Sequence, residues 1–278
     1  MSLPKTFISE TPLMRRITTT ILTMAAGLAL AATAFATPTP NSAVLHTRVF
    51  DDCPISILTT TNAFPGLIEI NDQNLPPQPL CSGFANLHTW RFSTDGTNAI
   101  QFLNGDAFEY SATVVLNGAG EGGLSLSPWF SPDADGLFNC RTTDGEIACF
   151  GGRMPFFTFT GAFGLLYVNN TPIQLGITYL PRGLSASNPA QIVYNIRYNS
   201  INYTSGLINF DEGNTSEDPP HGLWGALNPW YAGGHDKMFA FPSAQPHGMD
   251  AKWLDIQYST SPVATKKSSW TEIKKLYH

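Results

Sequence analysis

The sequence predicts an all-β fold of many short antiparallel strands, packed as a sandwich or a barrel. Three observations predict it. Apolar and polar residues alternate over short segments, turns rich in Gly, Pro and Asn separate these segments, and the main part of the chain lacks the period of a helix. Among 278 residues, 24 are glycine, 21 are proline and only 13% are charged. Such a composition is typical of strands and tight turns rather than of amphipathic helices.

The alternation is clearest in residues 173–179 and 192–198, where every second residue is a large apolar one. Each segment therefore presents one apolar face to a core. The other predicted strands are residues 44–50, 90–93, 99–103, 108–116, 124–129, 137–143, 146–150, 156–160, 163–168, 205–210 and 253–258.

The order of these segments resembles the concanavalin A-like lectin/glucanase superfamily, with its LamG-type jelly roll. The residues that carry the resemblance are 108–116 (FEYSATVVL), 122–129 (GGLSLSPW), the turn Asp144-Gly145, the strand 173–180 with Pro181-Arg182-Gly183 after it, and the last strand 252–258 (KWLDIQY). The resemblance implies a two-sheet antiparallel jelly-roll sandwich over residues 37–258. Lectins, glycan-binding modules, glycosidases, lyases and adhesion domains all share this fold, so the resemblance alone leaves the function open.

Residues 1–36 have the order of a cleavable secretory signal. Lys5, Arg15 and Arg16 supply a basic start, an uncharged segment follows, and Ala34-Phe35-Ala36 is a cleavage site of the A-x-A kind. Met14 is an alternative start. An uncleaved anchor is the competing interpretation, but the apolar run is short and Thr-rich for a span of roughly 20 apolar residues. We therefore expect an extracellular or surface-displayed protein without a transmembrane segment after cleavage.

Removal of residues 1–36 makes the chain more acidic. Three basic residues and one acidic residue are lost, so the net charge changes from −6 to −8. An acidic surface repels phosphate backbones, and we do not expect nucleic acid as a partner.

Four cysteines follow the signal, at Cys53, Cys81, Cys140 and Cys149. An even number in an exported chain is typical of disulfides, and the lack of a C-x-x-C pair disfavours a zinc site. Asp144-Gly145 predicts a two-residue hairpin turn. Counting outward from this turn places Cys140 opposite Cys149 in a non-hydrogen-bonded pair, close enough for a bridge. We expect the disulfides Cys140–Cys149 and Cys53–Cys81.

The chain changes character at residues 259–278, which begin as a linker. Ser269 and Glu272 form a capping-box pattern, and apolar residues follow at near-helical spacing. Two interpretations stay open, a short C-terminal helix or a sorting tail.

Catalytic motifs are not apparent. The glucanase branch of the superfamily carries Glu-x-Asp-x-x-Glu on one strand, a motif this sequence lacks, and Glu146 is expected to contact Arg141 across its hairpin instead. Nucleophile-elbow, zinc-protease and P-loop motifs are also lacking. His221, His235 and His247 are candidate bases for a lyase, without an identified partner.

A calcium site is the better chemical hypothesis. Asp133, Asp135 and Asn139 offer oxygen ligands around a Gly turn, and Asp-x-Asp-Gly is a recurring fragment of hard-cation loops. The alternative is a polar hairpin loop in which Asp and Gly form the turn.

An aromatic segment at residues 221–235 suggests sugar binding. Trp224, Trp230 and Tyr231 offer rings that stack on sugars, and His221 and His235 offer hydrogen bonds. The alternative is that Trp224 begins a buried strand. We therefore interpret the chain as a binding domain without catalysis, for a glycan or cell-surface polysaccharide. A carbohydrate-active enzyme, hydrolase or lyase, and a structural or adhesion protein are the alternatives.

Overall fold

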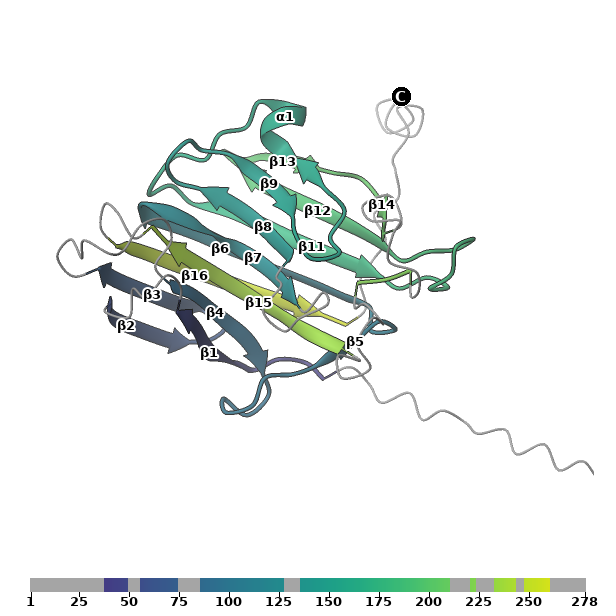
Figure 1. The fold of residues 1–278 in the computed structure, drawn as a ribbon, viewed down its shortest axis with the longest axis horizontal. Helices are drawn as coiled ribbons and strands as arrows, with labels where there is room; N and C mark the ends of the chain where they lie inside the picture. The colour runs from purple at the N-terminus through teal and green to yellow at the C-terminus, as the bar shows by residue number, and fades with distance from the viewer. Residues whose placement is uncertain are drawn as a thin grey trace, which may run out of the picture. The chain divides into compact units, whose positions relative to one another are not determined.

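The computed structural model describes residues 38–49, 56–74, 86–127, 136–210, 221–223, 233–243 and 248–260. The chain divides into Met1–Ala36 and Thr37–His278, and every described residue belongs to the second unit. Within it, the described residues form two eight-stranded antiparallel sheets, here called sheet A and sheet B (Figure 1). The predicted two-sheet antiparallel sandwich is confirmed.

Strands far apart in the sequence are neighbours in both sheets. Sheet A has the order β1 (Ser42–Val49), β4 (Asn86–Ser93), β15 (Gly233–Pro242), β7 (Gly120–Ser127), β8 (Gly136–Arg141), β9 (Ile147–Phe150) and β10 (Phe157–Thr158), with β5 (Phe102–Leu103) beside β15. Sheet B has the order β13 (Ile201–Thr204), β12 (Gln191–Tyr198), β11 (Ile173–Leu180), β6 (Phe108–Gly118), β16 (Met249–Ser259), β3 (Leu67–Asn74) and β2 (Ser56–Ala63), with β14 (Ile208–Asn209) beside β12.

The core lies between the sheets, as the alternation predicts. The apolar residues of 173–179 and 192–198 are all buried. Aromatic rings pack across the two sheets, with ring centroids 5.3 Å apart for Phe92 and Tyr110 and 5.6 Å apart for Phe138 and Tyr194. Trp253 Nε1 on β16 donates a hydrogen bond to the Gly123 carbonyl on β7 at 3.0 Å. These contacts hold the two sheets together.

Four strands were not predicted, namely β2, β3, β13 and β15. β2, β3 and β15 interrupt the apolar alternation with polar residues, and β13 has only four residues. On β15, the buried residues Asp236 and Lys237 precede the apolar residues Met238 and Phe239. A strand that buries charged groups has a weak hydrophobic pattern, which is the signal that sequence interpretation uses.

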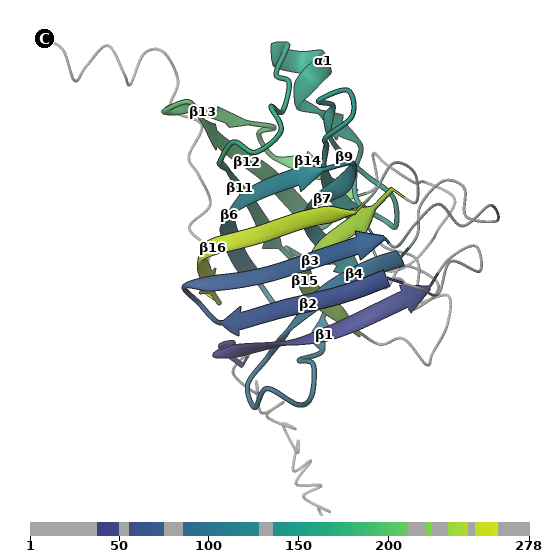
Figure 2. The same ribbon diagram turned by 90° about the vertical axis from the view of Figure 1, so that its left-hand side faces the viewer.

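The predicted strands at residues 156–160 and 163–168 are mostly wrong. Only Phe157–Thr158 is a strand, and a short helix, α1 (Phe159–Phe163), follows it. Thr158 caps this helix by accepting a hydrogen bond from Gly161 N, and Gly164 ends it with a φ of 67°. In both views α1 lies near β9 and β13, at the opposite end of the sandwich from β1 and β2 (Figure 2). No helix among the described residues has the length and apolar character to cross a membrane.

The predicted register of the β8–β9 hairpin is wrong by two residues. Cys140 pairs with Ile147, and Cys149 pairs with Phe138. Thr142–Gly145 form a four-residue loop, in which Gly145 has a φ of 80° and its N–H donates to the Arg141 carbonyl. Asp144 and Gly145 are thus the last two residues of a longer loop and not the centre of a two-residue turn.

The changed register separates the two cysteines of this hairpin. Cys140 and Cys149 are diagonal neighbours on the buried face, and both are free thiols in the structure. Diagonal Cα atoms of paired strands lie about 7–8 Å apart, beyond the usual range of a disulfide. The predicted Cys140–Cys149 disulfide is therefore wrong. Cys53 and Cys81 lie outside the described residues.

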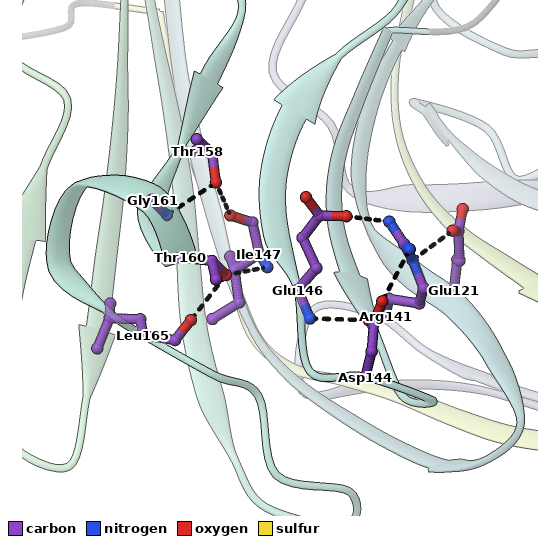
Figure 3. A network of polar contacts seen from close by, with 9 residues as sticks. All are labelled: Glu121, Arg141, Asp144, Glu146, Ile147, Thr158, Thr160, Gly161 and Leu165. Atoms are coloured by element: carbon purple, nitrogen blue, oxygen red, sulfur yellow. Dashed lines mark hydrogen bonds and ion pairs between the residues drawn. The ribbon is translucent and has the colours of Figure 1, made fainter.

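Arg141 is the centre of a group of ion pairs on the outer face of this hairpin (Figure 3). Its guanidinium forms ion pairs with Glu121 on β7 at 3.1 Å, with Asp144 in the loop at 2.9 Å, and with Glu146. The predicted contact between Glu146 and Arg141 is confirmed. Figure 3 also shows Thr160 beside this hairpin, where its hydroxyl accepts a hydrogen bond from Ile147 N at 2.8 Å and donates to the Leu165 carbonyl.

The two buried thiols are expected to be unreactive in the folded protein. Burial raises the pKa of the Cys140 and Cys149 thiols, which keeps them protonated and poorly nucleophilic. Iodoacetamide should leave both unmodified in the native protein and modify both after unfolding in guanidinium without reductant. Mass spectrometry of the peptides measures this, and a disulfide-linked 140/149 peptide would contradict the free-thiol state.

Candidate functional site

Besides the two cysteines of the hairpin, the structure describes three of the predicted ligand-binding and metal-binding residues. Asn139 lies on β8, His221 lies in a short segment before residue 224, and His235 lies on β15. The predicted residues Trp224, Trp230, Tyr231, Asp133 and Asp135 lie outside the described residues, and so does His247.

The segment around His221 is anchored by its backbone. The His221 carbonyl accepts a hydrogen bond from Ala190 N at 2.8 Å, and the Gly222 carbonyl accepts one from Arg153 Nε at 2.9 Å. Leu223 N donates to the Tyr179 hydroxyl on β11 at 3.3 Å. His221 is therefore fixed beside sheet B, whereas His235 belongs to sheet A.

The strand register brings basic residues together on the outer face of sheet A. Trp90 on β4 pairs with Met238 on β15, and both side chains belong to the core. The residues before and after them therefore face outward. Arg91 pairs with Lys237, and His235 lies two residues before Lys237 on the same face.

Neighbouring strands extend this outer face with polar residues. Lys237 pairs with Ser125 on β7, and Thr89 on β4 pairs with His46 on the edge strand β1. The Thr89 hydroxyl donates a hydrogen bond to the His46 carbonyl at 3.2 Å. We call His46, Arg91, His235 and Lys237 the basic cluster.

Much of this outward face is buried. Lys237 is 1% exposed and Ser125 is 0% exposed, although both point away from the core. Arg91 and His235 are half-buried, and His46 is exposed. Burying an ammonium group costs free energy unless polar groups surround it. The ammonium group of Lys237 therefore needs polar groups around it on this face, and Lys237 does interact with other groups of the chain.

Two further buried polar groups lie on this face. Ser125 Oγ and Asn139 Oδ1 have no hydrogen-bond partner among the described residues. Asn139 pairs with Gly123, two residues from Ser125 on the neighbouring strand. Native proteins rarely leave buried polar atoms without partners, and such atoms require an explanation in a water, ion or ligand.

The hydrogen bond of His235 determines its tautomer. Nδ1 lies 2.7 Å from the Ile100 carbonyl oxygen. Because a carbonyl oxygen can only accept, Nδ1 carries the proton and Nε2 keeps its lone pair. Burial, together with the positive charges of Arg91, Lys237 and His46, lowers the pKa of His235 to about 4, against the effect of the Ile100 hydrogen bond. The imidazole is therefore neutral at pH 7.

The arrangement combines cationic donors with a neutral base. Arg91 can bind an anionic group, the buried Lys237 adds positive charge behind it, and Nε2 of His235 can accept a proton or a hydrogen bond next to it. Sequence interpretation identified only His235 in this cluster, as part of an aromatic loop. Recognising residues 233–242 as a strand would have placed Lys237 on the same face as His235.

No set of three or more His, Cys, Asp and Glu side chains suited to a metal ion occurs in the described part of the chain. Because Asp133 and Asp135 lie outside that part, the calcium site stays a prediction. Asn139, its third predicted ligand, lies on the outer face of β8 and is 2% exposed.

The lowered pKa of His235 predicts a loss of stability in acid. The pKa is about 4 in the folded protein and about 6.5 in the unfolded chain, so the unfolded chain binds more protons between these values. This contribution is fully present above about pH 6.5 and is lost as the pH falls to about 4, by about 3 kcal/mol. Urea unfolding at pH 7 and pH 4 should show a smaller loss for His235→Gln than for the wild type. Equal losses would contradict the shift.

No protein-family model and no curated protein sequence matches the chain. Similar solved structures include family 7 alginate lyase A1-II′ with a bound substrate, at 10% identity and a TM-score of 0.43, over 74% of this chain and 83% of that chain. A cysteine variant of the same lyase is similar at 9% identity and a TM-score of 0.41, over 73% of this chain and 83% of that chain. The Lotus tetragonolobus seed lectin is similar at 9% identity and a TM-score of 0.35, over 79% of this chain and 100% of the lectin.

All three structures are at most 10% identical to this chain. With TM-scores below 0.5, the similarities assign neither a ligand nor an activity to this chain.

Proposed function

We propose that this protein is exported and binds an acidic polysaccharide on the outer face of sheet A. The basic cluster carries the proposal, because four basic side chains converge on one face of an otherwise acidic chain. The carboxylates of uronate sugars are the anionic groups that an exported protein of this fold would meet. The secretory signal predicted at residues 1–36 supports export.

The exposure of each residue of the basic cluster determines how it would act on a ligand. His46 is exposed and Arg91 is half-buried, so both can contact a ligand directly. The planar guanidinium of Arg91 suits a carboxylate, which it can bind through two parallel hydrogen bonds. Lys237 lies below them, and its charge acts in a buried environment of low dielectric constant, where electrostatic attraction is stronger than in water.

A second candidate function is a polysaccharide lyase, favoured by the unprotonated Nε2 of His235. A neutral imidazole next to two cations could remove the C5 proton beside the carboxylate of a uronate, while the cations stabilise the negative charge that develops. The glycosidic C4–O bond then breaks as the C4=C5 double bond forms, and the departing oxygen takes a proton from the imidazolium or from water. Binding and elimination would use the same face, so the two functions differ only in whether a product forms.

Binding is tested with Arg91→Gln. Titration calorimetry with alginate and polygalacturonate should show a loss of affinity of about tenfold or more, since a charge-assisted hydrogen bond contributes about 1.5–3 kcal/mol. Raising the salt concentration should weaken the wild type more than the variant. The control is Arg182→Gln, which removes an exposed guanidinium bonded to Gln191. Equal affinities of the wild type and Arg91→Gln would refute the proposed site.

The lyase is tested by incubating the wild type with the same polymers and following the ultraviolet absorbance of an unsaturated uronate product. His235→Gln should abolish product formation while leaving most of the binding affinity, because the base acts on the reacting proton and not on the carboxylate. A wild type that binds without forming product would exclude the lyase and leave the binding function standing.

A further inference from the structure

A groove of about 460 Å³ crosses the outer face of sheet B, on the opposite side of the core from the basic cluster. One row of paired residues runs across five strands beneath it. Gly176 on β11 pairs with Ser111 on β6 and with Asn195 on β12. Ser111 pairs in turn with Gln257 on β16, and Asn195 pairs with Thr204 on β13.

Gly176 forms the floor of this groove. A Cβ atom at Gly176 would lie 3.5 Å from Ser111 Cβ and 3.8 Å from Asn195 Cβ, which are ordinary contact distances. Neither packing nor backbone conformation therefore requires glycine here. Glycine in the interior of a strand lowers stability, and it often marks a bulge, a tight bend, or a place where a ligand or another backbone approaches closely.

The walls of the groove carry polar side chains that can form hydrogen bonds with a ligand. Gln174, Asn195, Asn202 and Gln257 contribute four amides, and Glu109 and Arg197 contribute one charge of each sign. None of these six side chains forms a hydrogen bond or ion pair with another described residue. Each amide offers both donors and acceptors, which is what a sugar hydroxyl requires, since it donates and accepts as well.

We propose that this groove binds a neutral oligosaccharide. The lining has no net charge, which removes the attraction that an anionic ligand needs. An extended peptide would need the free backbone groups of an edge strand, but the floor of the groove is formed by β6, β11 and β12, which use theirs in pairing on both sides. Tyr203 at one end, whose ring packs 5.3 Å from that of Phe163, provides an apolar surface. The volume lies within the usual range of small-ligand sites.

The proposal is independent of the proposed function, because the two sites lie on different sheets and recognise different chemistry. The first measurement is a screen of the intact protein on an array of neutral oligosaccharides, including β-glucans, xylans and mannans. Titration calorimetry then gives the affinity for the best of them. We expect at least one of these sugars to bind the wild type.

Gly176→Val provides the sharpest test. Its side chain fills the floor of the groove and should lower the affinity about tenfold or more, while the melting temperature stays unchanged or rises, because valine favours strands. Asn195→Ala removes one amide without filling the groove, and should also weaken binding. The control is Thr113→Val, a change on the outer face of β6 outside the groove, which should bind like the wild type.

Arg91→Gln separates this site from the one on sheet A, since it should lose affinity for polyuronates and keep its affinity for the neutral sugar. If Gly176→Val fails to fold, Asn195→Ala decides. The proposal is overturned if the wild type binds no neutral oligosaccharide. It is also overturned if the folded groove variants bind the sugar as well as the wild type does.

Discussion

The outer face of sheet A depends on the register in which β4, β15 and β7 pair. Trp90, Met238 and Leu124 occupy one row across these strands and point into the core. Because side chains alternate with a period of two, burying that row places Arg91, Lys237 and Ser125 on the opposite face. A shift of one residue would bring the charges into the core and is strongly disfavoured. The basic cluster is thus held in place by the packing of apolar residues behind it.

The same strand also buries an acid. Asp236 lies one residue before Lys237 and points into the core, where burial raises the pKa of its carboxyl well above the usual range. Contact with the Tyr258 hydroxyl opposes that rise, and the Asp106 carboxyl adds to it. This raised pKa lowers the stability of the fold at neutral pH. The Asp236 carboxyl ionises more readily in the unfolded chain than in the folded one, so stability falls as the pH rises. Burying an acid and a lysine on one strand lowers the stability of the fold. Such a loss of stability is common near functional sites.

The sequence was sufficient for the strands with clear apolar alternation and insufficient for β15, which carries His235 and Lys237 of the basic cluster. Residues 173–179 and 194–198 show clear alternation because small or polar residues separate their apolar ones. β15 was not predicted because two of its buried residues, Asp236 and Lys237, are ionisable and interrupt the apolar pattern. The β8–β9 register depends on whether Asp144-Gly145 forms a two-residue or a four-residue loop, and both loops accept these two residues. α1 depends on a cap by Thr158 and on two glycines, whereas its phenylalanines suggest a strand.

The two candidate sites differ in how the fold supports them. The basic cluster combines residues from three strands that the chain supplies far apart in the sequence, so only the folded sheet creates it. The groove on sheet B also crosses several strands, but its chemistry comes from amides at positions where a solvated sheet would tolerate many residues. The two sheets of a sandwich lie about 10 Å apart, and their outer faces point in opposite directions. A short oligosaccharide therefore cannot occupy both faces of one molecule. If both sites bind, each would hold a separate glycan chain, and the protein would act as a bridge between an acidic polymer and a neutral one.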